Sequence, residues 1–221
     1  MGWDSKEHKD DVRFINYELA PKGKADYAFI LDGLYSLKDD GVMVAILPHG
    51  VLFRGAAEGK IRRRLIDNNL IDAVIGLPEK LFDVTSIPVC IMILKKNRKN
   101  KDILFIDASS EFKKGKNKNF LTDDTVAKIY ETYQKREFVD KYANDVDLDE
   151  IKENDYNLNI PRYVDTFEPE PPVDVDKLVK DMKETDKKIN QFNTEINGML
   201  NELVGHDEKA QQELDLIKSL F

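Results

Sequence analysis

Hydrophobic residues concentrate between positions 41 and 94, where three apolar runs follow one another at residues 42–47, 71–75 and 87–94. Each run is rich in β-branched residues and shows no regular alternation with polar ones. This pattern is typical of strands that are buried on both faces of a sheet. Between the first two runs, apolar residues recur at helical spacing, which predicts a helix over residues 58–70.

A strand, a helix and a second strand in this order form a βαβ unit, which implies a parallel pair of strands joined by a right-handed crossover. Residues 76–86 show no helical pattern, so the third strand is predicted to return antiparallel to the second. The fold class predicted for this part of the chain is α/β, with one reversed strand.

Two further helices and one further strand are predicted around this stretch. One helix covers residues 24–37, and the other covers residues 122–135 with Thr122 as its N-cap. Residues 103–106 form the strand. Residues 1–24 and 111–119 are predicted to be loops, and residues 155–164 are too short and asparagine-rich for a helix.

A proline-rich segment, EPEPPV at residues 168–173, predicts a boundary between two parts of the chain. We divide the chain into residues 1–167, a linker at 168–174, and a helical hairpin at 175–221. In the hairpin, apolar residues recur every seven positions in two interleaved series, as in a coiled coil. The first series is Val175, Met182, Ile189, Ile196 and Leu203. The second is Leu178, Phe192 and Met199, interrupted by Thr185. Gly205 ends this long helix and Asp207 begins a second one. A hairpin that projects from a domain cannot bury both of its faces on itself, so we expect a partner.

Composition excludes several classes of protein. In 221 residues, no apolar run reaches the roughly 18 residues of a membrane helix, and the N-terminus has no hydrophobic signal segment. We therefore expect a cytoplasmic protein with no membrane partner. Cys90 lies inside an apolar run and is predicted to be a buried hydrophobe. The histidines have no metal-ligand spacing with Cys90 or with one another, so no metal site is predicted.

The net charge of −8 argues against a protein that binds nucleic acid on its own. Charge is unevenly distributed, however. Residues 95–118 carry nine Lys or Arg against three Asp or Glu, a local +6, whereas residues 137–186 carry sixteen acidic against six basic residues, a local −10. Both stretches are open to two interpretations: solvated loops and surface helices, or a basic rim near the sheet and an acidic connector kept away from DNA.

Several separate segments together resemble one known family. They are KADYAFILDGLYSLKDDGVMVAILPHGVLFRGAAEGKIR, VIGLPEKLF, IPVCIMILKK and ENDYNLNIPRYVD, in that order. From about residue 3 to residue 165 the chain is similar to the modification subunit of type I restriction–modification systems. These subunits are adenine-N6 DNA methyltransferases that use S-adenosylmethionine. The resemblance implies the class I methyltransferase sheet, whose last strand is antiparallel, followed by the C-terminal helical hairpin.

Two motifs of this family do not occur in the chain. One is the acidic-aromatic-glycine loop that binds the cofactor, and the other is the catalytic tetrapeptide N-P-P-[FY]. In the family, the tetrapeptide comes shortly before the segment that aligns with residues 3–14. The chain is therefore interpreted as the C-terminal part of such an enzyme. No catalytic residue is assigned in it, and no cofactor is expected for this part alone.

The resemblance also assigns roles to individual residues. Tyr27 and Phe29 open the helix where an aromatic side chain lies against the cofactor adenine in the family, although Phe29 is equally interpretable as a core residue. Phe82 follows the second strand, in the loop whose aromatic residue stacks on the extruded target base. Pro48-His49-Gly50 ends the first strand at the edge where α/β sheets bind ligands, which makes His49 a candidate DNA contact beside a simple turn role for Gly50.

Contacts with the DNA backbone are predicted for the basic loop, by Lys113, Lys114, Lys116 and Lys118; a solvated loop is the alternative. Docking on the specificity subunit is predicted for the apolar residues of the long helix: Val175, Leu178, Met182, Ile189 and Phe192. The partners that the resemblance implies are the specificity subunit, the restriction subunit and duplex DNA.

Three hypotheses about function follow from these observations. In the first, the chain is part of a methyltransferase that transfers a methyl group from S-adenosylmethionine to N6 of a flipped adenine. In the second, it is part of an enzyme that methylates protein glutamine by way of N-P-P-Y. In the third, this polypeptide is a non-catalytic interaction module within an assembly. An N-P-P-[FY] motif encoded upstream of Met1 would favour the first two.

The absence of both motifs leads to a prediction about the chain by itself. Because neither the cofactor loop nor N-P-P-[FY] occurs in it, the purified polypeptide is expected neither to bind S-adenosylmethionine measurably nor to methylate DNA. Isothermal titration calorimetry with S-adenosylmethionine checks the first part. Micromolar affinity would contradict it.

Overall fold

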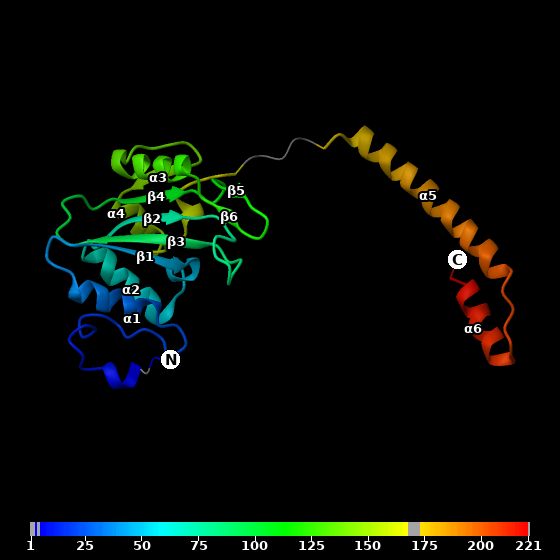
Figure 1. Cartoon of the computed structure of the whole chain (residues 1–221), viewed down its shortest axis with the longest axis horizontal. Coiled ribbons are helices and arrows are strands. Elements are labelled where there is room, and N and C mark those ends of the chain that lie inside the picture. Colours follow the sequence, from blue (N-terminus) through cyan, green and yellow to red (C-terminus); the bar gives the residue numbers. More distant parts are fainter. Residues whose placement is uncertain (1–2, 4, 168–172, 221) are drawn as a thin grey trace. The chain divides into compact units, whose positions relative to one another are not determined.

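The computed structural model describes residue 3 and residues 5–167 and 173–220, and the chain divides into two units, Met1–Phe167 and Glu168–Phe221 (Figure 1). The proline-rich segment used above as a boundary lies, at residues 168–172, outside the described residues. In the part of the chain that is described, no helix is both long enough and apolar enough to cross a membrane.

A five-stranded mixed sheet forms the centre of the first unit. Its strands lie in the order β1 (Val42–Pro48), β3 (Val89–Lys95), β2 (Ile71–Gly76), β4 (Ile103–Asp107) and β7 (Ala143–Val146). Strand β3 runs antiparallel to both β1 and β2, β4 is parallel to β2, and β7 is antiparallel to β4. The predicted reversal of the third strand is confirmed.

The predicted parallel pairing of β1 with β2 is wrong. The two strands run in the same direction, because each is antiparallel to β3, but β3 lies between them and takes the hydrogen bonds of both. The α2 helix (Ala56–Asp67) therefore connects two strands that are not neighbours.

Helices cover the sheet on two sides. The α1 helix (Asp26–Ser36) and α2 lie on one face, and α3 (Asp123–Lys135) lies on the other (Figure 1). The predicted N-cap of α3 is confirmed, because the backbone N–H of Thr125 donates to the Thr122 hydroxyl over 3.2 Å. Cys90 is fully buried in β3, and burial raises the pKa of its thiol to about 12, which agrees with a packing role.

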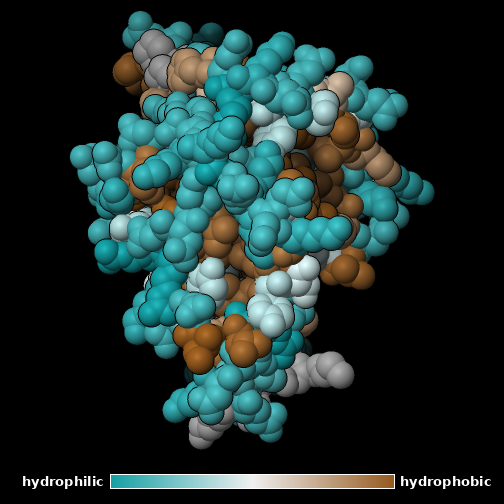
Figure 2. All heavy atoms as spheres, turned by 90° about the vertical axis from the view of Figure 1, so that its left-hand side faces the viewer, coloured by the Kyte–Doolittle hydropathy of each residue, from teal (hydrophilic) through white to brown (hydrophobic). Residues whose placement is uncertain are grey.

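Burial on both faces, predicted for all three strands, holds for β2 but not for β1. Val42, Val44 and Ile46 are 52%, 61% and 57% exposed, because β1 is the edge of the sheet and α3 packs against β2 and β4. Figure 2 shows apolar atoms gathered in a recess on one side of an otherwise mostly hydrophilic surface. A hollow of about 340 Å³ between the sheet and α3 is lined only by apolar and aromatic residues: Val44, Ile75, Leu77, Ile91, Ile93, Leu121, Val126, Ile129, Tyr130 and Tyr133.

Several short elements lie in stretches for which no helix or strand was predicted. Residues 1–24 contain the 3-10 helix η1 (Ser5–His8), and residues 49–52 form a second one, η2 (His49–Leu52). The loop at residues 111–119 contains a small hairpin of β5 (Lys113–Lys114) and β6 (Asn119–Phe120). The helix α4 (Leu148–Glu153) and the 3-10 helix η3 (Ile160–Arg162) follow β7.

Residues 155–164, near the end of the first unit, pack against the sheet and against α2. The ring of Tyr163 stacks on Phe105 of β4 with 4.2 Å between ring centroids. The backbone N–H of Leu158 donates to the carbonyl of Leu52 over 2.9 Å. The buried guanidinium of Arg62 in α2 donates to the carbonyl of Tyr156 over 2.7 Å. The segment thus closes the core on the face that α1 and α2 cover.

A buried carboxylate, that of Asp72, holds several elements together at the other end of the sheet. Asp72 at the start of β2 is 5% exposed and accepts a hydrogen bond of 2.6 Å from the hydroxyl of Tyr133 in α3. Its carboxylate also lies 3.0 Å from the Lys95 ammonium, 3.0 Å from the Arg98 guanidinium and 3.3 Å from that of Arg136. Two cations of the predicted basic rim therefore face the protein interior.

The second unit consists of α5 (Val175–Asn201) and α6 (Glu208–Lys218). The side chains of Asp174 and Asp207 cap them, accepting from the backbone N–H groups of Lys177 at 3.0 Å and Ala210 at 2.8 Å. Contacts between the helices half-bury residues in the C-terminal part of α5, such as Ile196 and Leu200. Among the described residues of both helices, none is fully buried.

The Asp72 cluster predicts how stability depends on pH. Burial raises the pKa of this carboxyl, but the hydrogen bond from Tyr133 and the charges of Lys95, Arg98 and Arg136 lower it by more. A carboxyl whose folded-state pKa lies below its unfolded value, about 4, contributes stability above that pH. That contribution is lost as the pH falls through the folded-state pKa.

We therefore expect Asp72→Asn to lower the free energy of unfolding at pH 7 by about 3–5 kcal/mol, because Arg98 loses its buried partner. The difference from the unchanged chain should begin to shrink below about pH 4, where Asp72 is protonated in the unfolded chain, and should vanish only as the pH falls through the lower folded-state pKa. Urea unfolding followed by Trp3 fluorescence measures it. The matched control is Asp39→Asn on the exposed turn before β1. A difference that is equally large at pH 7 and pH 3 would contradict this account.

Candidate functional site

The loop between β2 and β3, residues 77–88, is a short hairpin with an apolar tip; it is called the Phe82 loop below. The backbone N–H of Leu77 donates to the carbonyl of Val89 over 2.9 Å and closes its base. Phe82 and Thr85 form a β-bridge near the tip. Phe82 is 41% exposed and Val84 is 95% exposed, so the tip presents apolar surface to solvent.

The small hairpin of β5 and β6 lies against this loop. The backbone N–H of Asn119 donates to the carbonyl of Lys80 over 2.8 Å, and its side-chain amide donates to the carbonyl of Glu79 over 2.9 Å. The Lys118 ammonium lies 3.0 Å from a carboxylate oxygen of Asp83. A hollow of about 380 Å³ is lined by residues of both segments: Glu79, Lys80, Phe112, Lys114, Gly115, Lys116, Asn117, Lys118 and Asn119. The fold thus brings together Phe82 and the lysines predicted to contact DNA.

The four lysines of the hairpin differ in their surroundings. Lys113, Lys114 and Lys116 are exposed, and none of them forms an ion pair within the described part of the chain. Lys118 is half-buried and pairs with Asp83. Three positive charges beside an apolar tip form a surface that could hold a polyanion with exposed bases.

His49 lies at the start of η2, directly after β1. Its Nε2 donates to the carbonyl of Val89 over 3.0 Å, and the side chain is half-buried. A Cβ added at Gly76, the last residue of β2, would lie 3.8 Å from the His49 ring. His49 is therefore at the carboxyl ends of β1 and β2, against the base of the Phe82 loop.

The two aromatic residues at the start of α1 lie in different environments. Tyr27 is fully buried, its hydroxyl donates to the carbonyl of Val51 over 2.8 Å, and burial raises its pKa. That carbonyl also accepts from the Arg62 guanidinium at 3.1 Å, which ties Tyr27 into the core. Phe29 is 73% exposed, so the alternative that Phe29 is only a core residue is wrong.

The apolar residues predicted for docking lie exposed along α5. Val175, Met182 and Phe192 are 64%, 58% and 59% exposed, and Leu178 and Ile189 are 47% and 49% exposed. We call this row of five the α5 seam.

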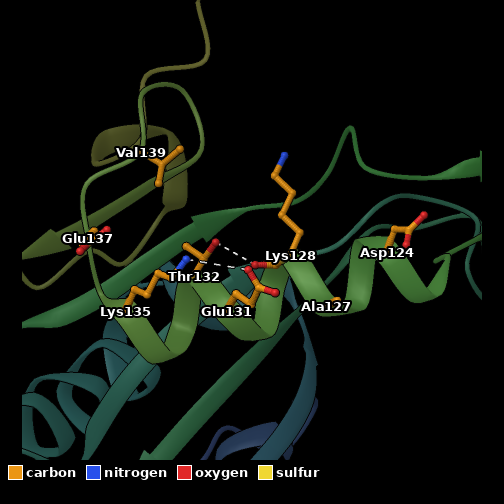
Figure 3. A pocket seen from close by; sticks show the side chains of 8 residues that line it. All are labelled: Asp124, Ala127, Lys128, Glu131, Thr132, Lys135, Glu137 and Val139. Carbon is orange, nitrogen blue, oxygen red and sulfur yellow. Dashed lines mark hydrogen bonds and ion pairs between the residues drawn. The ribbon is translucent and has the colours of Figure 1, made fainter.

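A charged hollow of about 420 Å³ lies on the outer side of α3, and Figure 3 shows its lining. Its side chains interact with one another or with neighbouring groups: the Thr132 hydroxyl donates to the carbonyl of Lys128 over 2.8 Å, and Lys135 lies 3.9 Å from Glu131 (Figure 3). No residue singled out from the sequence lines this hollow. Among the described residues there is also no group of His, Cys, Asp and Glu able to hold a metal ion.

Arg62 and Asn119 are among the buried polar residues that the sequence analysis did not single out. Arg62 follows Ile61 and lies one turn before Leu65 and Ile66, so a basic residue on the apolar face of the predicted helix was a usable signal. Asn119 lies in a run of lysines and asparagines, where nothing distinguishes it from the exposed Asn117.

Comparison with known proteins decides the family. Residues 1–171 match the family model described as N-6 DNA Methylase. The chain belongs to the N-6 DNA methylase family. The resemblance inferred from the sequence segments is thereby confirmed.

Relatives within the family include methylase subunits of type I restriction enzymes. The MpnII methylase subunit of Mycoplasma pneumoniae is 37% identical over 195 residues, which cover 87% of this chain and 36% of that protein. The MjaVII methylase subunit of Methanocaldococcus jannaschii is 39% identical over 205 residues, which cover 87% of this chain and 35% of that protein. The chain thus spans about a third of the length of these relatives.

A solved structure supports the same assignment. The methyltransferase subunit of a type I restriction–modification system from Streptococcus thermophilus is 58% identical, with a TM-score of 0.74, over 76% of this chain and 36% of that one. The mixed α/β architecture, with its five-stranded sheet and C-terminal helices, matches that of type I methylase subunits.

Proposed function

We propose that this chain is the C-terminal part of a site-specific adenine-N6 DNA methyltransferase subunit of a type I restriction–modification system. In the intact assembly, a methyl group would pass from S-adenosylmethionine to N6 of an adenine turned out of the duplex. The observation that carries this proposal is that hydrogen bonds hold the Phe82 loop, with its exposed Phe82, against a hairpin with three exposed lysines. Family membership and the names of the relatives agree with it.

The chemistry of the Phe82 loop suits a flipped base. An adenine inside a duplex presents its amino group in the major groove, where an active-site pocket cannot enclose it, so the enzyme extrudes the nucleotide and loses stacking energy. An exposed aromatic ring compensates part of that loss. Lys113, Lys114 and Lys116 would contact phosphates beside the target, and His49 lies at the base of the same loop. Phosphate contacts add affinity and position the duplex without reading its sequence.

Cofactor binding belongs to the intact enzyme. S-adenosylmethionine is implied by the family, and of the two aromatic residues predicted to lie near it, only Phe29 is exposed. None of the hollows described above is lined by Phe29. In the intact enzyme, Phe29 would supply an aromatic surface on one side of the cofactor site. The strand order β1-β3-β2 with β3 reversed is the arrangement expected for the end of a class I methyltransferase sheet.

The exposed α5 seam favours a second role, that of an interaction module, which this chain would perform whether or not it takes part in catalysis. Its relatives are subunits of type I restriction enzymes by name. We infer that the seam docks on helices of the specificity subunit and that the assembly also includes the restriction subunit.

Since the proposed substrate is duplex DNA, the assembly would act in the cytoplasm. The α5 seam and the exposed lysines of the β5–β6 hairpin favour DNA over protein glutamine as the substrate.

The role of Phe82 is tested in the full-length subunit assembled with its partner subunits. Phe82→Ala should remove one stacking contact worth about 1–3 kcal/mol, which lowers turnover on duplex DNA roughly five- to 150-fold. Affinity for S-adenosylmethionine should stay nearly unchanged, and Phe82→Trp should be tolerated. Radiolabelled methyl transfer at saturating cofactor measures the effect. The control is Phe138→Ala, an exposed aromatic residue outside this loop. If Phe82→Ala lowers the melting temperature by several degrees but leaves methylation intact, Phe82 is a core residue instead.

The docking role of the α5 seam is tested by placing charge in it. Ile189→Asp together with Phe192→Asp should abolish capture of the specificity subunit in a pull-down, because each unpaired buried charge costs several kcal/mol. The circular dichroism of the α/β unit should be unchanged. The control, Lys180→Gln with Lys187→Gln, alters the opposite side of the same helix and should retain binding. Capture by the seam variant at the unchanged level would contradict the docking role.

A further inference from the structure

Asn119 is one of the few buried polar side chains of the first unit, at 8% exposure, although it lies in a strongly hydrophilic hairpin. Buried polar groups are normally hydrogen-bonded, and the partner of a buried amide shows what it holds in place. Both donor groups of Asn119, its backbone N–H and its side-chain amide, are directed at carbonyls of the Phe82 loop, those of Lys80 and Glu79.

A second attachment lies on the other side of Phe82. The Lys118 ammonium pairs with Asp83 at 3.0 Å, and Asp83 is the residue directly after Phe82. The loop is thus held before Phe82 by Asn119 and after it by Lys118. Lys80 has a φ of 57°, in the left-handed region that is unfavourable for residues with a Cβ. Such a conformation persists only where the surroundings hold it, and the hydrogen bond to the carbonyl of Lys80 is a contact able to do so.

We propose that Asn119 and the Lys118–Asp83 ion pair are positioning elements that hold the Phe82 loop in the conformation required for stacking on the flipped base. This inference rests on the proposed function of Phe82. It divides the four lysines into two groups: Lys113, Lys114 and Lys116 meet phosphates, whereas Lys118 acts within the protein. Binding of the hairpin to the DNA backbone then sets Phe82 at a fixed distance from the phosphates, which couples positioning to recognition of the target base.

The first experiment compares Asn119→Ala with Asn117→Ala in the full-length subunit within its assembly. Asn117 lies in the same hairpin but is exposed, which makes it the matched control. Hydrogen exchange of the amides of residues 80–87 reports the loop, and fluorescence of 2-aminopurine at the target position of a duplex reports base stacking. For Asn119→Ala we expect faster exchange and a roughly 3- to 10-fold lower turnover on duplex DNA, a smaller change in the same parameter that Phe82→Ala lowers, as the loss of one hydrogen bond implies. Cofactor affinity should be nearly unchanged.

The second experiment separates the role of Lys118 from phosphate binding. Lys114→Ala should reduce the dependence of log K on log salt by about one, as the loss of a phosphate contact does. Lys118→Ala should leave that dependence unchanged and loosen the loop instead. The double variant Lys118→Asp with Asp83→Lys should restore slow exchange and 2-aminopurine stacking, because it re-forms the ion pair with the charges exchanged.

These measurements distinguish failure of the inference from failure of the proposed function. If Phe82→Ala itself leaves the 2-aminopurine signal and methylation unchanged, the proposed role of Phe82 fails, and the inference fails with it. If Phe82→Ala has its expected effect but Asn119→Ala behaves like Asn117→Ala, the inference alone is overturned. Should Asn119→Ala unfold, Asn119→Asp serves in its place, since it keeps the size of the side chain and the backbone hydrogen bond but removes the amide donor.

Discussion

The insertion of β3 between β1 and β2 is the constraint on which the rest of the first unit depends. Because β3 is antiparallel to β2, the chain must leave β2 at its carboxyl end and return at the same edge of the sheet. The connecting loop is therefore placed beside the carboxyl end of β1, which carries His49. Carboxyl ends of strands are where open α/β sheets bind ligands. The reversal of one strand thus brings an aromatic residue to the end of the sheet at which open α/β sheets bind ligands.

At the opposite ends of these strands, polar contacts hold the elements of the first unit together. There, Asp72 gathers a tyrosine from α3 and cations from the end of β3, from the turn that follows it and from the residue after α3. Each of these groups comes from a different element, so the cluster fixes their mutual positions. The basic stretch of residues 95–118 therefore contains two populations of cations. The first neutralises a buried carboxylate, and the second faces solvent near Phe82. A count of charges along the sequence cannot separate them, because the two differ only in where the fold directs their side chains.

Much of the fold was predictable because its long elements carry strong hydrophobic patterns. The runs at residues 71–75 and 87–94 became β2 and β3, and the helical spacing before them became α2. Strand β7 was missed because Asn144 and Asp145 interrupt its apolar pattern and its pairing with β4 decides its conformation. In the candidate site, the resemblance predicted the place of Phe82 in the loop before the reversed strand, and the structure has it between β2 and β3. Asn119 was not predictable, since the carbonyl that its amide meets belongs to Glu79, 40 residues earlier.

The open face of β1 has a consequence for the behaviour of the purified chain. Val42, Val44 and Ile46 stand exposed on a strand whose outer edge pairs with no other described strand. An apolar edge strand with free backbone donors and acceptors is a template on which a strand of another molecule can form. As the protein is concentrated, encounters between such edges increase, so self-association through β1 is expected to grow with concentration. A molecule that covers β1 would suppress this self-association without changing a residue of the site.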